Sequence, residues 1–191
     1  MKRYIITGTP GSGKTSIIRQ LELDGFTVVE EAATDIIAAA QAQGRIEPWT
    51  DPSFIDEIAR LQKDREHRIP NLPQGIQFYD RSVVCTAALA TYLGYPLSPF
   101  LTSELERIKR ESIFQIPVFF IRNLGFVTPT GARRITFEES LRFEKIHKSI
   151  YHSFGFELVH IEPAPLCERV NAIRASVNEG STKAKLRPND V

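Results

Sequence analysis

The segment from Gly8 to Thr15, G-T-P-G-S-G-K-T, constrains this chain more than any other feature of its sequence. It follows a short apolar run at 4–7 and opens a stretch in which Ile17, Ile18 and Leu21 recur at helical spacing. Closely spaced glycines let a backbone curl and aim its N–H groups at anionic oxygens, and the following helix adds the positive end of its dipole. The spacing in this context predicts a phosphate-binding P-loop rather than an ordinary glycine-rich turn.

The chemistry of such a loop assigns roles to two of its residues. Lys14 would reach the β- and γ-phosphates as a mobile charge, and the Thr15 hydroxyl is placed to ligate Mg²⁺. The residues predicted to bind the nucleotide are Gly8, Thr9, Pro10, Gly11, Ser12, Gly13, Lys14, Thr15 and Ser16.

Composition limits the remaining possibilities. The chain has 191 residues, of which 42% are hydrophobic and 25% charged, as expected for one soluble globular domain. A net charge of +1 gives no general signal for nucleic-acid binding, and no apolar run approaches the roughly 18 residues of a membrane span. We therefore expect a cytoplasmic protein with a domain over 1–177, whose Cys85 and Cys167 are reduced packing residues, and a flexible tail over 178–191.

Strand-like and helix-like runs alternate along the chain, which predicts an α/β fold with a parallel sheet covered on both faces. The predicted strands are 4–7, 26–30, 76–80, 116–121 and 157–161, and the predicted helices are 14–23, 31–43, 52–69, 82–93, 98–114, 137–153 and 165–178. Ligands of such folds bind at the carboxyl ends of the strands. That edge would carry Gly8, Glu30, Asp80 and Arg122.

Carboxylates follow two of these strands. Glu30 and Glu31 end the second strand, where a carboxylate facing the P-loop could accept a proton from an acceptor or hold Mg²⁺ through water. An acidic helix N-terminus explains them equally well, and because they are adjacent, at most one faces the site. Asp80 ends the third strand and is predicted to order Mg²⁺ or take the acceptor proton. The sequence leaves open which carboxylate is the base.

Two further stretches could bind the acceptor. Arg81 directly follows Asp80 and could hold an acceptor phosphate or sugar hydroxyl, while Ser82 can cap the next helix. Trp49, the only tryptophan, could stack on a planar ring, although packing under a loop explains it somewhat better.

A long loop rich in Gly, Pro and Thr follows the fourth strand and ends in Arg133 and Arg134. Loops of this length in a compact domain are usually functional, so a lid over about 123–136 is predicted, with arginines that neutralise the transferred phosphoryl group. A solvated basic loop is the alternative. Thr136 and Glu139 form a capping box for the following helix.

Together, G-T-P-G-S-G-K-T-S at 8–16, E-E at 30–31, D-R-S at 80–82 and R-R at 133–134 resemble small bacterial AAA-type predicted ATPases of the P-loop kinase class. Relatives of that class include the ribosylnicotinamide kinases and, more distantly, the deoxynucleoside and thymidylate kinases. The resemblance implies a five-stranded parallel sheet in the order 2-3-1-4-5, Mg-ATP at the P-loop, and acceptor and metal handled by Glu30 or Glu31, Asp80 and Arg81. Thr130-Gly131-Ala132 stands where many members have Asp-Gly, so no lid carboxylate is expected.

The leading hypothesis is a phosphotransferase that moves the γ-phosphoryl group of ATP to a small nucleoside- or nucleotide-like acceptor. In it Lys14, Thr15 and Mg²⁺ polarise the phosphates, while Arg81, Arg133 and Arg134 hold anionic charge. A nucleotide-dependent switch acting on a protein partner, or a sensor without hydrolysis, are the alternatives. The acceptor's identity and the oligomeric state cannot be derived from the sequence.

Overall fold

The structure is a computed structural model that describes residues 1–69, 75–126 and 135–185, with side chains described as far as residue 178. Its strands are β1 (Lys2–Thr7), β2 (Thr27–Val29), β3 (Ile76–Asp80), β4 (Pro117–Ile121) and β5 (Glu157–Ile161). Its helices are α1 (Lys14–Leu23), α2 (Ala33–Ala42), the 3₁₀ helix η1 (Pro48–Thr50), α3 (Ser53–Arg68), α4 (Val83–Leu93), α5 (Pro99–Arg110), α6 (Phe137–Ser153) and α7 (Leu166–Lys185).

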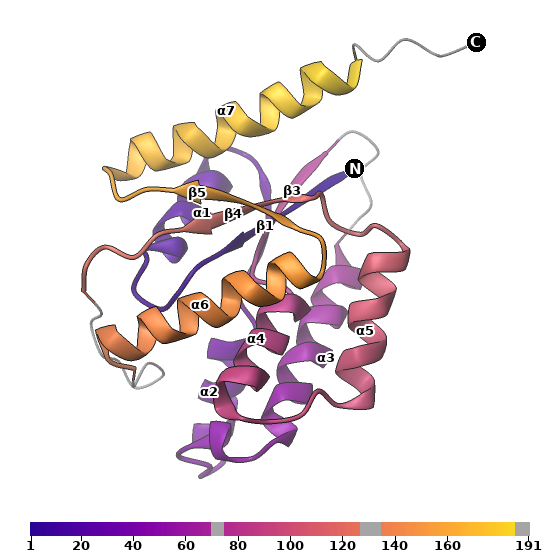
Figure 1. The fold of residues 1–191 in the computed structure, drawn as a ribbon, viewed down its shortest axis with the longest axis vertical. Coiled ribbons are helices and arrows are strands. Elements are labelled where there is room, and N and C mark those ends of the chain that lie inside the picture. Colours follow the sequence, from indigo (N-terminus) through magenta and orange to yellow (C-terminus); the bar gives the residue numbers. More distant parts are fainter. Residues whose placement is uncertain (70–74, 127–134, 186–191) are drawn as a thin grey trace.

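The strands form one parallel sheet in the order β2-β3-β1-β4-β5. Helices cover both faces, with α7 on one face and the bundle that contains α3, α4, α5 and α6 on the other (Figure 1). Because all strands run the same way, their carboxyl ends, and the loops that follow them, meet at one edge of the sheet.

Alternation along β1 explains the two cores. Tyr4 and Ile6 pack with residues of α1 and α7, whereas Ile5 packs with residues of α2 to α6. Successive side chains of a strand point to opposite faces, so a central strand must be apolar at every position to fill both layers. The sheet order places β1 between β3 and β4, which puts the P-loop at the centre of the edge.

The expected sheet, its order and its helices are confirmed. The helix predicted at 165–178 is too short, because α7 continues to Lys185. The tail predicted at 178–191 stays a prediction. Among the described side chains, Val177 is the last of α7 in the buried core, and a helix that is already anchored extends at the cost of only one residue per hydrogen bond. The arginine-bearing part of the predicted lid, 127–134, lies outside the described residues. None of the described helices is long and apolar enough to cross a membrane.

Candidate functional site

The P-loop has the backbone geometry that its glycines predict. Gly8 has φ of 144°, and a Cβ there would lie 2.4 Å from the carbonyl oxygen of Ile121, so only glycine fits beside the end of β4. Gly11 and Gly13 also have positive φ, of 83° and 81°. These conformations turn the backbone around a concave centre just before α1.

Several polar side chains in the loop are buried. The Oγ1 of Thr9 and the Oγ of Ser12 are buried without a hydrogen-bond partner among the described residues. Lys14 is only 7% exposed, and its Nζ donates to the carbonyl oxygen of Thr9 at 3.4 Å. Burial, reinforced by the nearby charge of Arg81, lowers the pKa of Lys14 to about 8. Buried polar groups without partners are expected where a ligand would supply the bonds.

The remaining residues predicted for the nucleotide lie on the open side of the loop. Thr15 and Ser16 are exposed in the first turn of α1, and Pro10 is half-buried. Pro10, Lys14 and Thr15 line a cavity of about 360 Å³ that extends from the P-loop between α2, α3 and α4. A volume of this size is typical of small-molecule sites.

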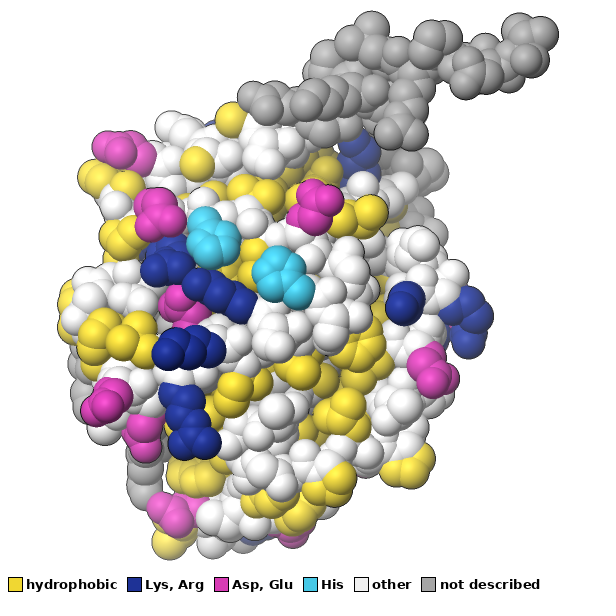
Figure 2. Space-filling view, viewed as in Figure 1, with side chains coloured by type: hydrophobic (Ala, Val, Ile, Leu, Met, Phe, Trp, Pro, Cys, Tyr) yellow, Lys and Arg dark blue, Asp and Glu magenta, His cyan; other side chains and the backbone are white. Residues whose placement is uncertain are grey.

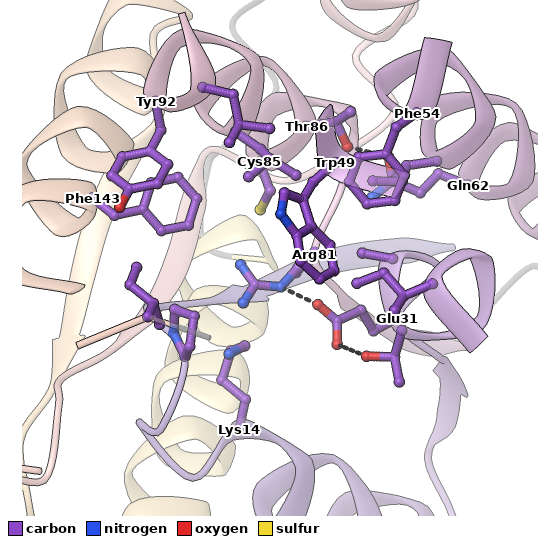
Figure 3. Close-up of a pocket in the computed structure, with 18 of the residues that line it drawn as sticks. Lys14, Glu31, Trp49, Phe54, Gln62, Arg81, Cys85, Thr86, Tyr92 and Phe143 are labelled. Carbon is purple, nitrogen blue, oxygen red and sulfur yellow. Dashed lines mark hydrogen bonds and ion pairs between the residues drawn. The ribbon is translucent and has the colours of Figure 1, made fainter. Parts of the chain in front are cut away.

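The far part of this cavity is largely apolar and aromatic (Figure 3). Its lining there includes Trp49, Phe54, Gln62, Tyr92 and Phe143. Trp49 is half-buried, packs against the core and also lines the cavity, so both interpretations made from the sequence are compatible with its position. Gln62 accepts a hydrogen bond from Thr86 Oγ1 at 2.7 Å, which orients its carboxamide within the apolar wall.

The structure separates Glu30 from Glu31. Glu30 turns outward, forms an ion pair with Arg19 at 2.6 Å, and has a side chain that is 52% exposed. Glu31 lines the cavity, has a side chain that is 27% exposed, and accepts hydrogen bonds from Arg81 and Thr34. Of the two glutamates, Glu31 is the one that lines this cavity.

Arg81 connects the third strand to Glu31. Its Nε donates to Glu31 Oε1 at 2.6 Å, and both side chains point into the cavity (Figure 3). Its backbone has φ of 74°, which is unfavourable for a residue with a Cβ, and its N–H donates to the carbonyl oxygen of Ile6 at 3.0 Å. Such strain is typical of functional sites, where the surrounding structure fixes one side chain's direction.

The pKa shifts of Glu31 and Asp80 have opposite directions. Burial favours a raised pKa for Glu31, but the charges of Arg81 and Lys14 outweigh it and the pKa is lowered, so Glu31 is ionised at neutral pH. Burial dominates at Asp80, whose pKa is raised despite the charge of Lys14. Asp80 is 7% exposed, and its Oδ1 has no hydrogen-bond partner among the described residues. An orphaned buried carboxylate oxygen at the end of β3 suits a cation held beside the P-loop.

Arg65, which no sequence signal singles out, holds the turn that carries Glu31. From α3, its guanidinium donates to the carbonyl oxygens of Glu30 at 2.9 Å and Glu31 at 2.5 Å, and pairs with Asp35. In the sequence, Arg65 is one of several basic residues between 60 and 68, a pattern that a solvated helix face explains. Helical spacing alone cannot separate a charge that reaches a distant backbone from one that faces solvent.

Arg122 and Asn123 follow β4 at the carboxyl edge of the sheet, but their side chains contact α6 and not the P-loop cavity. Both contact Glu144 of α6, through Arg122 Nη1 to Oε1 at 3.2 Å and Asn123 Nδ2 to Oε2 at 3.3 Å, and Lys148 also bonds Glu144. Glu144 thus joins the two segments that flank 127–134. On the face that α6 presents, Lys and Arg side chains gather in one group with acidic side chains among them (Figure 2). The predicted Arg133 and Arg134 lie outside the described residues.

Cysteines and metal ligands add little to the site. Cys85 is buried and lines the cavity, and its Sγ contacts Tyr151 Oη at 2.8 Å and Thr7 Oγ1 at 3.1 Å. Cys167 is exposed, so the expectation that it packs in the interior was wrong. Within the described residues, no group of three or more His, Cys, Asp or Glu side chains could hold a metal ion by itself.

Comparison with known proteins places the chain in a family. Residues 3–169 match the model of an AAA domain, which covers most of the chain and includes the P-loop. The chain belongs to this AAA domain family. A P-loop domain of this kind implies nucleotide binding. No curated protein matches the sequence.

Solved structures share the fold at low sequence identity. Deoxyadenosine kinase from M. mycoides, with products dCMP and dCDP bound, matches with a TM-score of 0.62 and 12% identity, covering 93% of this chain and 99% of the kinase. A NadR protein in complex with NAD and AMP-PNP matches with a TM-score of 0.66 and 20% identity, covering the whole chain but 51% of NadR. NadR in complex with NR matches with a TM-score of 0.61, 21% identity and coverage of 84% and 43%. The chain thus spans about half of NadR, and these likenesses show the fold alone.

Proposed function

We propose that this protein is an ATP-dependent phosphotransferase that moves the γ-phosphoryl group of Mg-ATP to a hydroxyl of a nucleoside-like acceptor. One observation carries the proposal: a single cavity runs from Lys14 of the P-loop to the Glu31–Arg81 pair and on to an aromatic end. A donor at the P-loop and an acceptor in the aromatic end would meet beside Glu31. Positioning of this kind supplies most of the catalysis of phosphoryl transfer.

The charges of the cavity favour a nucleoside over a nucleotide as acceptor. Among its described lining residues the cationic side chains are Lys14 and Arg81, and Arg81 is already paired with Glu31. An ionised Glu31 would repel an acceptor phosphate, but it can accept a hydrogen bond from a hydroxyl. Two proteins that share the fold support this choice, since one is a deoxyadenosine kinase and the other was solved with NR.

The aromatic end suits a flat heterocycle. Trp49 and Phe54 offer ring faces, and the Gln62 carboxamide can both donate to and accept from the polar edge of a base. A ribose between the base and the P-loop would then place a hydroxyl near Glu31.

In the proposed reaction Glu31 accepts the proton of the acceptor hydroxyl, and the hydroxyl oxygen forms a bond to the γ-phosphorus. The bond between the γ-phosphorus and the oxygen that links it to ADP breaks, so ADP leaves with that oxygen. Arg81 keeps Glu31 ionised and oriented, and Lys14 balances charge on the phosphates. Thr15 and Asp80 would hold Mg²⁺, which would neutralise negative charge on the phosphates when bound. The orphaned Oδ1 of Asp80 fits that assignment. Arg133 and Arg134 remain proposed lid residues that would stabilise the transferred group.

The test is ADP release from Mg-ATP, with the protein alone and with a panel of nucleosides, pyridine ribosides and their monophosphates. The proposal expects strong stimulation by at least one nucleoside and none by its monophosphate. It also expects Lys14→Ala to abolish turnover, with the exposed Lys109→Ala as the matched control. Slow hydrolysis that no acceptor changes would favour an ATP-dependent switch instead, and wild-type turnover by Lys14→Ala would refute both.

A further inference from the structure

A buried arginine, Arg169, contacts the P-loop but is not among the residues that line the cavity beside it. Arg169 lies in the first turns of α7, is 5% exposed, and reaches the loop across 157 residues of sequence. Its Nη2 donates to the carbonyl oxygen of Ser12 at 2.5 Å. Its guanidinium also lies against Gly13, where a Cβ would come within 2.9 Å of Nη1. A side chain at position 13 would therefore displace the guanidinium, and the positive φ of Gly13 also favours glycine.

The charge of Arg169 has no counter-ion among the described residues. It forms no ion pair with a described carboxylate, its Nε has no hydrogen-bond partner there, and burial lowers its pKa. Arg174, one turn further along α7, contrasts with it, because that side chain is exposed and pairs with Asp24 at 3.1 Å. A buried guanidinium without a carboxylate is costly, so its retention beside a phosphate loop suggests that an anion completes the balance.

The contact also determines which way one peptide group of the loop points. The C=O of Ser12 and the N–H of Gly13 belong to the same trans peptide and point in opposite directions. A guanidinium that holds the carbonyl from behind therefore directs the Gly13 N–H toward the concave centre. Backbone N–H groups of such a loop are the donors that bind phosphate oxygens.

We propose that Arg169 is a positioning residue for the polyphosphate of the nucleotide: it orients the Ser12–Gly13 peptide and supplies buried positive charge behind the loop. The inference rests on nucleotide binding at the P-loop, but it does not depend on which acceptor is used. It assigns to α7 a part in phosphate binding that the P-loop motif itself does not reveal.

The experiment measures the affinities of Mg-ATP and of inorganic tripolyphosphate for three proteins by titration calorimetry. These are the wild type, Arg169→Met, which keeps an unbranched apolar side chain but removes the guanidinium group, and Arg174→Met as a matched control on the same helix. Both phosphate ligands are expected to bind Arg169→Met about tenfold more weakly or worse, because a hydrogen bond from a charged group and its charge are lost. The control is expected to stay within about twofold, since exposed ion pairs contribute little.

Folding is checked by the melting temperature without ligand. If Arg169→Met does not fold, Arg169→Lys takes its place, because it retains the charge but its shorter side chain ends before the position of Nη2. Unchanged affinity for tripolyphosphate in a folded variant overturns the proposal, as does a loss confined to Mg-ATP, which would place Arg169 at the nucleoside part. Weakened phosphate binding in a protein that no acceptor stimulates would support Arg169 and refute the phosphotransferase. Failure of the wild type to bind Mg-ATP would overturn both.

Discussion

Arg81 Nε and Glu31 Oε1 lie 2.6 Å apart and join two turns that are 50 residues apart in the sequence. The contact brings the end of β3 to the turn between β2 and α2, at the edge of the sheet where β1 leads into the P-loop. Both side chains also line the cavity. A ligand in the cavity could therefore contact this charged pair directly.

Replacing Glu31 by Gln should remove the proposed proton acceptor while keeping the size of the side chain. We expect kcat with the best acceptor to fall about a hundredfold or more, the usual scale for a general base, with little change in the affinity for Mg-ATP. Steady-state kinetics with both substrates varied would measure this.

The adjacent Glu30 offers the matched control. Its carboxylate faces outward to Arg19, so Glu30→Gln should leave kcat and both KM values within about twofold. Equal losses in the two variants would mean that the orientation of this turn, and with it the assignment of Glu31, is incorrect.

Removing the charge of Arg81 should change the pH dependence. Arg81 and Lys14 hold the pKa of Glu31 below its ordinary value of 4.5, so the acid limb of kcat/KM in the wild type should lie below that pH. In Arg81→Met, burial of Glu31 would act with less opposition and raise its pKa, so activity should be lost at a higher pH than in the wild type. Profiles of kcat/KM between pH 4 and 8 would test this. An acid limb that does not move would show that another group controls it.

The fold could be predicted from the sequence because its signals are local. Each strand is a short apolar run before a turn, and Ile5 and Ile6 show that β1 must be buried on both sides. The P-loop residues could be found for the same reason, since Gly8 to Thr15 is contiguous. Ser82 and the Thr136–Glu139 capping box also depend only on near neighbours, and both caps are present.

The rest of the site depends on contacts between distant segments. The choice between Glu30 and Glu31 is decided by Arg19 of α1 and by Arg81 after β3, which lie on other elements. In the sequence, nothing distinguishes Gln62 from the other polar residues of its helix. Its orientation in the cavity wall depends on the hydrogen bond from Thr86 of α4. Such contacts arise from tertiary packing, on which periodicity and motif spacing carry no information.

The affinity for Mg-ATP should weaken above about pH 8. Without nucleotide, Lys14 loses its proton near pH 8. Bound phosphates would favour the protonated form, so above that pH nucleotide binding must be accompanied by protonation of Lys14, which weakens it. We expect Kd to increase by up to about tenfold per pH unit between pH 8 and 10. Lys14→Arg is the control, because its guanidinium remains protonated throughout. An affinity that is independent of pH in the wild type would contradict a lowered pKa for Lys14.

Arg65 should affect the acceptor step through Glu31. Its guanidinium donates to the carbonyl oxygens of Glu30 and Glu31 and pairs with Asp35, so Arg65→Gln would loosen the turn without removing any group that lines the cavity. We expect kcat/KM for the acceptor to fall about tenfold, because small displacements of a positioned group are costly, while KM for ATP stays unchanged.

Arg60 on the same helix is the comparison, since its guanidinium stacks on the Phe100 ring at 4.1 Å, away from this turn. Arg60→Gln should leave both kinetic constants near those of the wild type. If Arg65 only stabilised the fold, its loss would lower the melting temperature and reduce both substrates' kcat/KM alike. An effect confined to the acceptor would instead indicate that α3 positions Glu31 through the backbone of the turn.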